Sequence, residues 1–269
     1  MSEKQPQEPE SALPTGEPIA INQFSSARMG LVPGSSVLKV DRYAVACIPF
    51  RMSLSGAVLL TSFSPQELTL FMRYTNTIAG LSIAFQRADA AQTHKIFARC
   101  TIKSIAPMRG RESVGLISIA WKPCPPDLTT TLEEYLLMLE RLKVEYDDYK
   151  GKLIKLDPAN AALLGYNNYA AIIHGREQVK VAAFCLASDR LDFLVPKDGP
   201  ELVPKAMASV KLFFRSFQFV VSGILSDVQK LPNGAQKAIL SLNFCPELVD
   251  ILERYRFHEQ FSSQKTSIA

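Results

Sequence analysis

Three lysines at close spacing form the clearest cationic cluster in the sequence. Lys150, Lys152 and Lys155 follow a segment with helical periodicity and precede the second half of the chain. Ammonium groups gathered at such a junction bind anions, and phosphates in particular, because their charges add at short range. A solvated face would carry the same residues, so an anion site is only one of two interpretations of the cluster.

The cysteines and histidines show no pattern of a nucleophile or a metal site. The five cysteines are odd in number and contain no CxxC pair, which favours reduced thiols in a cytosol over a disulfide scaffold. The histidines are too few and too scattered to predict a metal site. Four cysteines lie in or beside apolar segments with no histidine nearby in the sequence, and we interpret them as core residues: Cys47, Cys100, Cys185 and Cys245.

The sequence carries none of the common enzyme motifs. A GxSxG turn, a P-loop, a Rossmann fingerprint, an HExxH pair and a paired-carboxylate constellation are all absent, so we do not expect an enzyme. The segment from Lys211 to Phe217 interleaves basic and aromatic residues, which is typical of a face that binds single-stranded nucleic acid. Its simpler interpretation is a buried strand, and a surface map of Phe213, Phe214 and Phe217 separates the two.

Length and composition indicate two small globular domains. The chain has 269 residues, of which 47% are hydrophobic and 21% charged, and this is too apolar for a disordered protein. The formal net charge is +4, and the basic and acidic residues are interspersed along the chain, so charge indicates no particular class of partner. The sequence shows neither a signal peptide nor an apolar run of about 18 residues. A cytoplasmic protein is therefore expected.

Two capping boxes and one turn define the clearest local elements. The segment Ser64-Pro65-Gln66-Glu67 predicts the start of a helix of roughly ten residues. Thr130 and Glu133 form a second box, after which leucines and tyrosines recur every three to four residues up to Gly151. We interpret that stripe as a docking face rather than an oligomer seam. Most other segments are rich in β-formers, and Pro232-Asn233-Gly234 predicts a hairpin.

The two halves of the sequence share an ordered pattern. Two strands with matching aromatic and aliphatic residues lead into a Cys-Pro step, an acidic residue and a helix. Two copies of this ending imply two small antiparallel barrels, each closed by its C-terminal helix. The matched positions are Phe97, Ile102 and Ser104 with Phe219, Ile224 and Ser226, and Ile117 to Trp121 with Leu240 to Phe244.

The predicted fold is mainly β (α+β), with two small antiparallel β-barrels joined by a helical linker. Trp121 and Phe244 are expected to occupy corresponding strand positions. The predicted boundaries are a disordered leader over residues 1–20, an N-terminal barrel over 21–128, a helical connector over 129–160, a C-terminal barrel with its helix over 161–261 and a disordered tail over 262–269.

Three segments of the first half carry a resemblance to a known family through their order and spacing. These segments are Arg51–Glu67, Ala79–Phe85 and Trp121–Leu128. With the repeated barrel ending, they resemble the PilZ family of bacterial cyclic-di-GMP receptors. The first half is similar to the N-terminal barrel that accompanies PilZ in spirochaete proteins, and the second half would be the PilZ barrel proper. The resemblance covers nearly the whole ordered chain.

The resemblance implies a ligand site made of two motifs. In the family, an RxxxR segment before the barrel and a [D/N]xSxxG turn on it hold the ligand, because guanidinium forks grip phosphate and the turn supplies acceptors. The first motif falls on Asp148 to Lys152, where aspartate and lysine replace the arginines, and the second falls on Leu186 to Leu191, with leucine at both ends. The polar groups left for a ligand are Lys150, Lys152, Ser188, Asp189 and Arg190.

The loss of these motif residues shapes the expected function. Each lost charge-assisted hydrogen bond is worth roughly 1.5 to 3 kcal/mol, so cyclic-di-GMP should bind on the order of a thousandfold more weakly than in the family. We expect a non-enzymatic bacterial signalling protein, of a kind that regulates motility, acting as a protein-interaction adaptor or weak nucleotide sensor. The expected partner is another protein, with no cofactor, nucleic acid or membrane. The alternatives are a cyclic-di-GMP effector with a non-standard site and an OB-like nucleic-acid binder.

Overall fold

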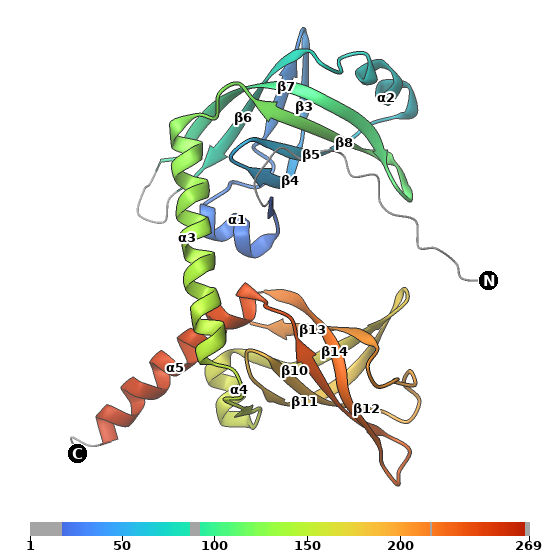
Figure 1. The fold of residues 1–269 in the computed structure, drawn as a ribbon, viewed down its shortest axis with the longest axis vertical. Coiled ribbons are helices and arrows are strands. Elements are labelled where there is room, and N and C mark those ends of the chain that lie inside the picture. The colour runs from blue at the N-terminus through green and yellow to red at the C-terminus, as the bar shows by residue number, and fades with distance from the viewer. Residues whose placement is uncertain (1–17, 87–91, 216, 267–269) are drawn as a thin grey trace. The chain divides into compact units, whose positions relative to one another are not determined.

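The computed structural model describes residues 18–86, 92–215 and 217–266 (Figure 1). The chain divides into two compact units, residues 1–137 and 138–269, and both are mainly β, as predicted. None of the described helices combines the length and the apolar character that crossing a membrane requires. Most of the predicted leader lies outside the described residues, as do residues 267–269 of the predicted disordered tail, but residues 262–266 of that tail continue a helix that begins at Pro246.

The first unit holds one antiparallel sheet with the strand order β1-β4-β5-β8-β7-β6-β2-β3. Its strands show the period of a half-buried sheet, since β7 alternates between buried and exposed residues from Ile96 to Cys100. The elements are β1 (Ile19–Ala20), α1 (Gln23–Met29), β2 (Val37–Val40), β3 (Tyr43–Ala46), β4 (Ile48–Ser53), β5 (Gly56–Ser62), α2 (Pro65–Met72), β6 (Ile78–Phe85), β7 (His94–Met108) and β8 (Arg111–Trp121).

The two ends of this sheet are joined by the chain itself. Strand β3 lies at one end of the order, and only Cys47 separates it from β4, which lies next to the other end. The backbone pairings among the described residues give an eight-stranded sheet in an open order. The sequence had predicted a closed barrel over residues 21–128. Strand β1 pairs with β4 through Ile19 and Met52, so the ordered sheet begins inside the segment predicted as leader.

The predicted helix at residue 64 is confirmed together with its cap. The Ser64 side chain accepts a hydrogen bond from the Glu67 N–H at 3.2 Å, and the Glu67 carboxylate accepts one from the Ser64 N–H at 2.8 Å. Proline at the first helical position fixes the backbone angle that the helix needs. Helix α2 starts at Pro65 for these reasons.

Helix α3 (Pro126–Asp148) begins four residues before the predicted capping box. Pro126 occupies its first position and Asp127 places an acidic group in its first turn, where the helix dipole favours negative charge. Thr131 lies inside the helix and donates its hydroxyl to the Asp127 carbonyl at 2.9 Å. The Thr130 box was therefore a helix-interior pattern and not the start.

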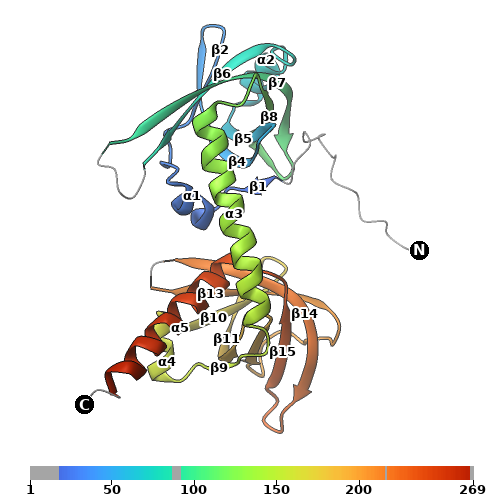
Figure 2. The same ribbon diagram turned by 60° about the vertical axis from the view of Figure 1, so that its left-hand side comes forward.

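The second unit contains a closed six-stranded antiparallel barrel (Figure 2). The order is β10-β13-β14-β15-β12-β11, and pairing between β10 and β11 closes the ring. Its core is apolar, with Leu191, Phe193 and Leu240 fully buried. The elements are β9 (Ile154–Lys155), α4 (Pro158–Leu164), β10 (Tyr166–His174), β11 (Glu177–Leu186), β12 (Arg190–Val195), β13 (Met207–Phe214), β14 (Gln218–Lys230), β15 (Gln236–Leu242) and α5 (Pro246–Thr266).

The repeated ending is present in both units as strand, strand, helix, but the predicted residue match is wrong. Phe97 is 61% exposed while Phe219 is 8% exposed, so these two side chains point to opposite faces of their sheets. Trp121 pairs with Cys100 in the ladder between β7 and β8. In the ladder between β14 and β15, the pair at the same distance from the bulge is Leu242 with Gly223. Trp121 therefore corresponds to Leu242 and not to Phe244. A one-residue slip reverses every side chain of a strand, which a match of letters does not reveal.

Three of the five cysteines are buried, as expected for core thiols: Cys47, Cys100 and Cys245. Burial raises the pKa of Cys47 to about 12 and that of Cys100 to about 11. Burial, with the nearby Glu247 carboxylate, also raises the pKa of Cys245. Cys185, which was predicted to be a core residue, is only half-buried on β11, as is Cys124, and burial raises the pKa of each.

We expect the three buried thiols, Cys47, Cys100 and Cys245, to resist Ellman's reagent at pH 8 in the folded protein. The thiolate is the reacting form, and a pKa of 11 or 12 lowers its population at least about a hundredfold relative to an unfolded thiol near 8.5. Timed labelling with and without denaturant measures the difference. Rapid modification of all five thiols in the native protein would contradict the assigned burial.

Candidate functional site

The two segments that the sequence assigned to a ligand site meet in the second unit. Residues 148–152 follow helix α3, and residues 186–191 form the end of β11, a turn and the start of β12. The Gly151 N–H donates a hydrogen bond to the Asp189 carboxylate at 2.9 Å. The structure thus places the turn of residues 187–190 beside the loop after α3, which we call the β11–β12 turn and the α3–β9 loop.

Gly151, three residues beyond the end of helix α3, adopts the left-handed conformation, with φ of +69°. Residues other than glycine adopt this conformation at a cost, so the glycine is what lets the chain leave the helix here. Its amide donates to the Asp189 carboxylate from the loop that follows the helix. The contact therefore joins the α3–β9 loop to the β11–β12 turn, and it does not cap the helix, whose unpaired backbone groups at this end are carbonyls.

Lys150 and Lys152 both interact with groups of helix α3. The Lys150 ammonium lies 2.6 Å from the Asp147 carboxylate and 4.8 Å from the centre of the Tyr146 ring. The Lys152 ammonium lies 5.9 Å from the Tyr149 ring centre. Cations at the last turn also interact favourably with the helix dipole. These contacts explain both lysines as parts of a helix end, the second of the two interpretations of the cluster.

Ser188 is fully buried and acts as a donor within the protein. Its hydroxyl donates to the Tyr146 carbonyl of α3 at 2.8 Å. The Asp189 carbonyl accepts from the Leu242 N–H at 2.8 Å, which ties the turn to the end of β15. The serine of the predicted motif therefore satisfies a helix carbonyl instead of facing solvent.

Arg190 is held by a carboxylate two residues along its own strand. Its Nε and Nη2 donate to the two oxygens of Asp192 at 2.6 and 2.9 Å. The Asp192 side chain is only 6% exposed, and the Arg190 side chain is 37% exposed. The hydrogen bonds to Asp192 raise the pKa of Arg190. Both ends of the guanidinium fork are thus used by a nearly buried acid.

Leu186 and Leu191 are core residues. They face each other as a cross-strand pair between β11 and β12 and are 1% and 0% exposed. In the family these positions carry the polar residue and the glycine of the turn motif. Here they fill the barrel interior, so this part of the predicted ligand site lies in the hydrophobic core.

Tyr146 of α3 and Tyr149, which directly follows the helix, complete the site, and only the docking stripe in the sequence pointed to them. The Tyr146 hydroxyl donates to the Leu242 carbonyl at 3.1 Å, and its ring lies edge-on to Phe244 at 5.6 Å. The Tyr149 ring lies 4.4 Å from the Arg256 guanidinium. Burial, with the Glu145 carboxylate, raises the pKa of Tyr149 to about 12. The last turn of α3 is therefore fixed to the second unit.

A basic and apolar surface covers the outside of strands β10, β11, β13 and β14, which we call the outer face. Tyr169 and Phe213 meet there with ring centres 4.7 Å apart, and the ammonium groups of Lys180 and Lys211 lie 5.5 and 5.2 Å from these rings. In the described residues of the four strands, carboxylates occur only near strand ends, at Glu177 and Asp227. The exposed apolar residues of this face are Met207, Val220 and Ile224.

The outer face corrects the interpretation of Lys211–Phe217 as a buried strand. Phe214 is buried and Phe217 packs against the core, as that interpretation requires. Phe213 and Lys211, however, alternate to the outside of β13 and are only partly covered. Strand periodicity gives one segment two faces, and residue types alone did not show which of the phenylalanines would turn outward.

The histidines lie far apart in the sequence and take different roles. His94 lies 3.0 Å from the Asp127 carboxylate on the surface of the first unit. His174 is exposed at the end of β10, and His258 lies on α5. Among the residues that the structure describes, no three metal-binding side chains form a cluster.

Comparison with known proteins gives matches among solved structures only. No protein-family model and no curated protein matches the sequence. PlzA of Borreliella burgdorferi, solved in complex with c-di-GMP, is 12% identical with a TM-score of 0.44, and the match covers 90% of this chain and 94% of that one. YcgR of Escherichia coli, also with c-di-GMP, is 9% identical with a TM-score of 0.30, covering 88% and 87%.

A third match is the inhibitor of motility MotI/DgrA of Bacillus subtilis. It is 10% identical with a TM-score of 0.28, and the match covers 85% of this chain and 97% of that one. All three matches have identities below 25% and TM-scores below 0.5, so nothing about this chain is concluded from them.

Proposed function

We propose that this chain is a non-enzymatic, PilZ-like signalling protein that works through protein contacts and does not bind cyclic-di-GMP in the mode of the family. One observation carries the proposal: the polar groups at the predicted ligand positions are engaged inside the protein. The Asp189 carboxylate accepts from the Gly151 N–H, Ser188 donates to the Tyr146 carbonyl, and Arg190 is bidentate with Asp192. The segments that would hold a ligand instead hold each other.

The energetics support this proposal. A ligand that used these three side chains would have to replace their internal hydrogen bonds, each worth about 1 kcal/mol net and more where a charge takes part. Freeing Arg190 would also leave the nearly buried Asp192 carboxylate without its partner, which is a further cost. The arginine clamp that could offset these costs is replaced by Asp148 and Lys152.

The outer face supports a protein as the partner. It combines exposed apolar side chains with two lysines and lacks carboxylates over most of its area, so an acidic protein surface with apolar residues complements it. Aromatic residues such as Tyr169 and Phe213 contribute much contact area at low entropic cost. An outer face with these exposed residues is suited to contact another protein, which supports an adaptor rather than an enzyme.

Isothermal titration of the full chain with cyclic-di-GMP tests the proposal. At physiological salt we expect no binding tighter than about 10 μM, because the site lacks its clamp and its turn is occupied. A dissociation constant below about 1 μM, equal to −8.2 kcal/mol, would overturn it and would favour an effector with a non-standard site.

The outer face also favours a second candidate, the binding of single-stranded nucleic acid. Lys180 and Lys211 beside two aromatic rings are the components of such a surface. Two cations neutralise few phosphates, so we expect a fluorescent 20-nucleotide oligo(dT) to bind no tighter than about 100 μM at physiological salt. Anisotropy titration measures this affinity. A submicromolar constant that the charge reversals Lys180→Glu and Lys211→Glu weaken would replace the protein-contact proposal.

A further inference from the structure

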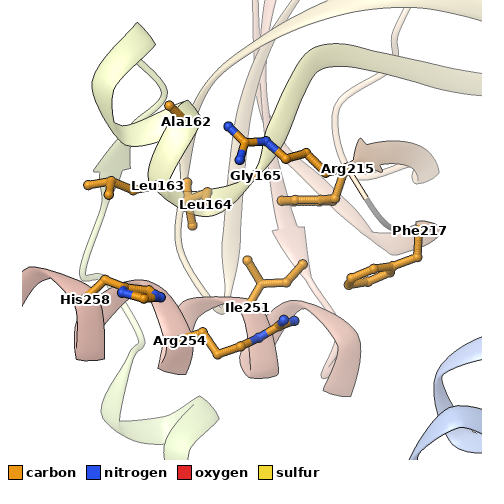
Figure 3. Close-up of a pocket in the computed structure, with 10 residues that line it drawn as sticks. Ala162, Leu163, Leu164, Gly165, Arg215, Phe217, Ile251, Arg254 and His258 are labelled. Atoms are coloured by element: carbon orange, nitrogen blue, oxygen red, sulfur yellow. The ribbon is translucent and has the colours of Figure 1, made fainter.

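A cavity of about 170 Å³ opens in the second unit, away from the β11–β12 turn. Helix α4 and helix α5 lie side by side at its walls, and residues after β13 and before β14 complete it (Figure 3). Polar and apolar groups share its wall about equally, and its rim carries three nitrogen-bearing side chains. The lining residues are Ala162, Leu163, Leu164, Gly165, Phe214, Arg215, Phe217, Ile251, Arg254 and His258.

The rim of the cavity is cationic. Figure 3 shows Arg215 above the cavity near Gly165, and Arg254 and His258 on the α5 side. Arg254 is fixed in place because its Nη2 donates to the Asp250 carboxylate at 2.8 Å and its Nε to the Asp250 carbonyl at 3.3 Å. The negative charge of Asp250 offsets the positive charge of Arg254. Arg215 therefore adds a net positive charge to the rim.

The floor of the cavity is apolar and partly aromatic. Leu164 and Ile251 are buried, with 7% and 4% exposure. Phe217 stacks on Phe214 at 6.0 Å with an angle of 21° between the rings, so a flat ring forms one wall. Helix α4 ends here and adds weak negative potential, but it is only seven residues long, and the Arg215 side chain lies beside its end at Gly165. The balance favours an anion with an apolar body.

We propose that this cavity binds a small aromatic anion, a phosphate or carboxylate carried on an aryl ring. The anionic group would lie against the exposed Arg215 guanidinium, which offers paired donors, because the Arg254 guanidinium is already held by Asp250. The ring would pack on Leu164, Ile251 and Phe217, since apolar pockets with a few placed polar groups are the usual form of small-molecule sites. This site is independent of the β11–β12 turn and goes beyond the proposed function.

Titration of the full chain with phenyl phosphate tests the proposal. We expect saturable binding with a dissociation constant below about 1 mM, which corresponds to −4.1 kcal/mol. Inorganic phosphate lacks the ring and phenol lacks the charge, so each should bind at least about tenfold more weakly. Equal affinity for phosphate and phenyl phosphate would show an adventitious anion site and overturn the proposal.

Two variants locate the binding site. Arg215→Gln removes an exposed charge from the rim, and Ala162→Phe fills the cavity from an exposed position on α4. Each should weaken phenyl phosphate at least about tenfold. Arg176→Gln is the matched control, because Arg176 is an exposed arginine between β10 and β11 and does not line the cavity. No saturation by about 10 mM, or equal effects of all three variants, would overturn the proposal.

Discussion

Leu186→Asp is expected to unfold the second unit under conditions in which the wild-type chain is folded. Leu186 is 1% exposed and faces Leu191 across the barrel ladder. A buried carboxylate without a partner costs several kcal/mol, a large part of the 5–15 kcal/mol that stabilises a typical domain. Chemical denaturation followed by circular dichroism should show a loss of at least about 3 kcal/mol.

Ala182→Asp is the control for this variant. Ala182 lies on the same strand, β11, with its side chain exposed, so the same charge should cost less than about 0.5 kcal/mol there. If both variants unfold at the same denaturant concentration, Leu186 is not a core residue and the described turn is wrong. The expected difference also means that restoring the acidic residue of the family motif cannot restore a ligand site in this barrel.

Arg190→Met should destabilise the second unit by about 2 kcal/mol, because it leaves the Asp192 carboxylate nearly buried and unpaired. The value is below that of a fully buried pair since Arg190 is 37% exposed. The same denaturation experiment measures it. The double variant Arg190→Met with Asp192→Leu should recover at least half of the loss, because an apolar pair replaces the ionic one.

Lys150→Met serves as the comparison for Arg190→Met. Lys150 pairs with Asp147 on an exposed surface, where ion pairs contribute little, so no measurable change in the free energy of unfolding is expected. If Arg190 faced a ligand instead of the Asp192 carboxylate, its replacement by Met would change stability as little as the replacement of Lys150. Equal small effects in the two variants would therefore contradict the structural role assigned to Arg190.

The sequence predicted elements well where one local signal decides them. The Ser64–Glu67 capping box set the start of α2, and the Pro232–Gly234 turn joins β14 to β15. The start of α3 was predicted too late because Pro126 and Asp127 compete with the Thr130 box four residues on. Local chemistry allowed both starts, and proline at the first position prevailed.

The contacts of the candidate site could not be predicted in the same way. Placing the motifs on residues 148–152 and 186–191 did bring together segments that meet in the structure, through Gly151 and Asp189. The direction of each polar group was not visible, because whether Ser188 faces a ligand or the Tyr146 carbonyl depends on packing between distant segments. The leucines at 186 and 191 were the available signal, since apolar residues flanking a turn indicate core strands.

Amide NMR of the full chain titrated with cyclic-di-GMP tests most directly whether the ligand positions are occupied by the protein itself. Gly151, Ser188 and Asp189 report the hydrogen bonds that join the α3–β9 loop to the β11–β12 turn. We predict that their resonances stay unchanged up to about 1 mM nucleotide, which corresponds to −4.1 kcal/mol. Saturable shifts confined to residues 148–152 and 186–191 would contradict the account and would place a working nucleotide site there.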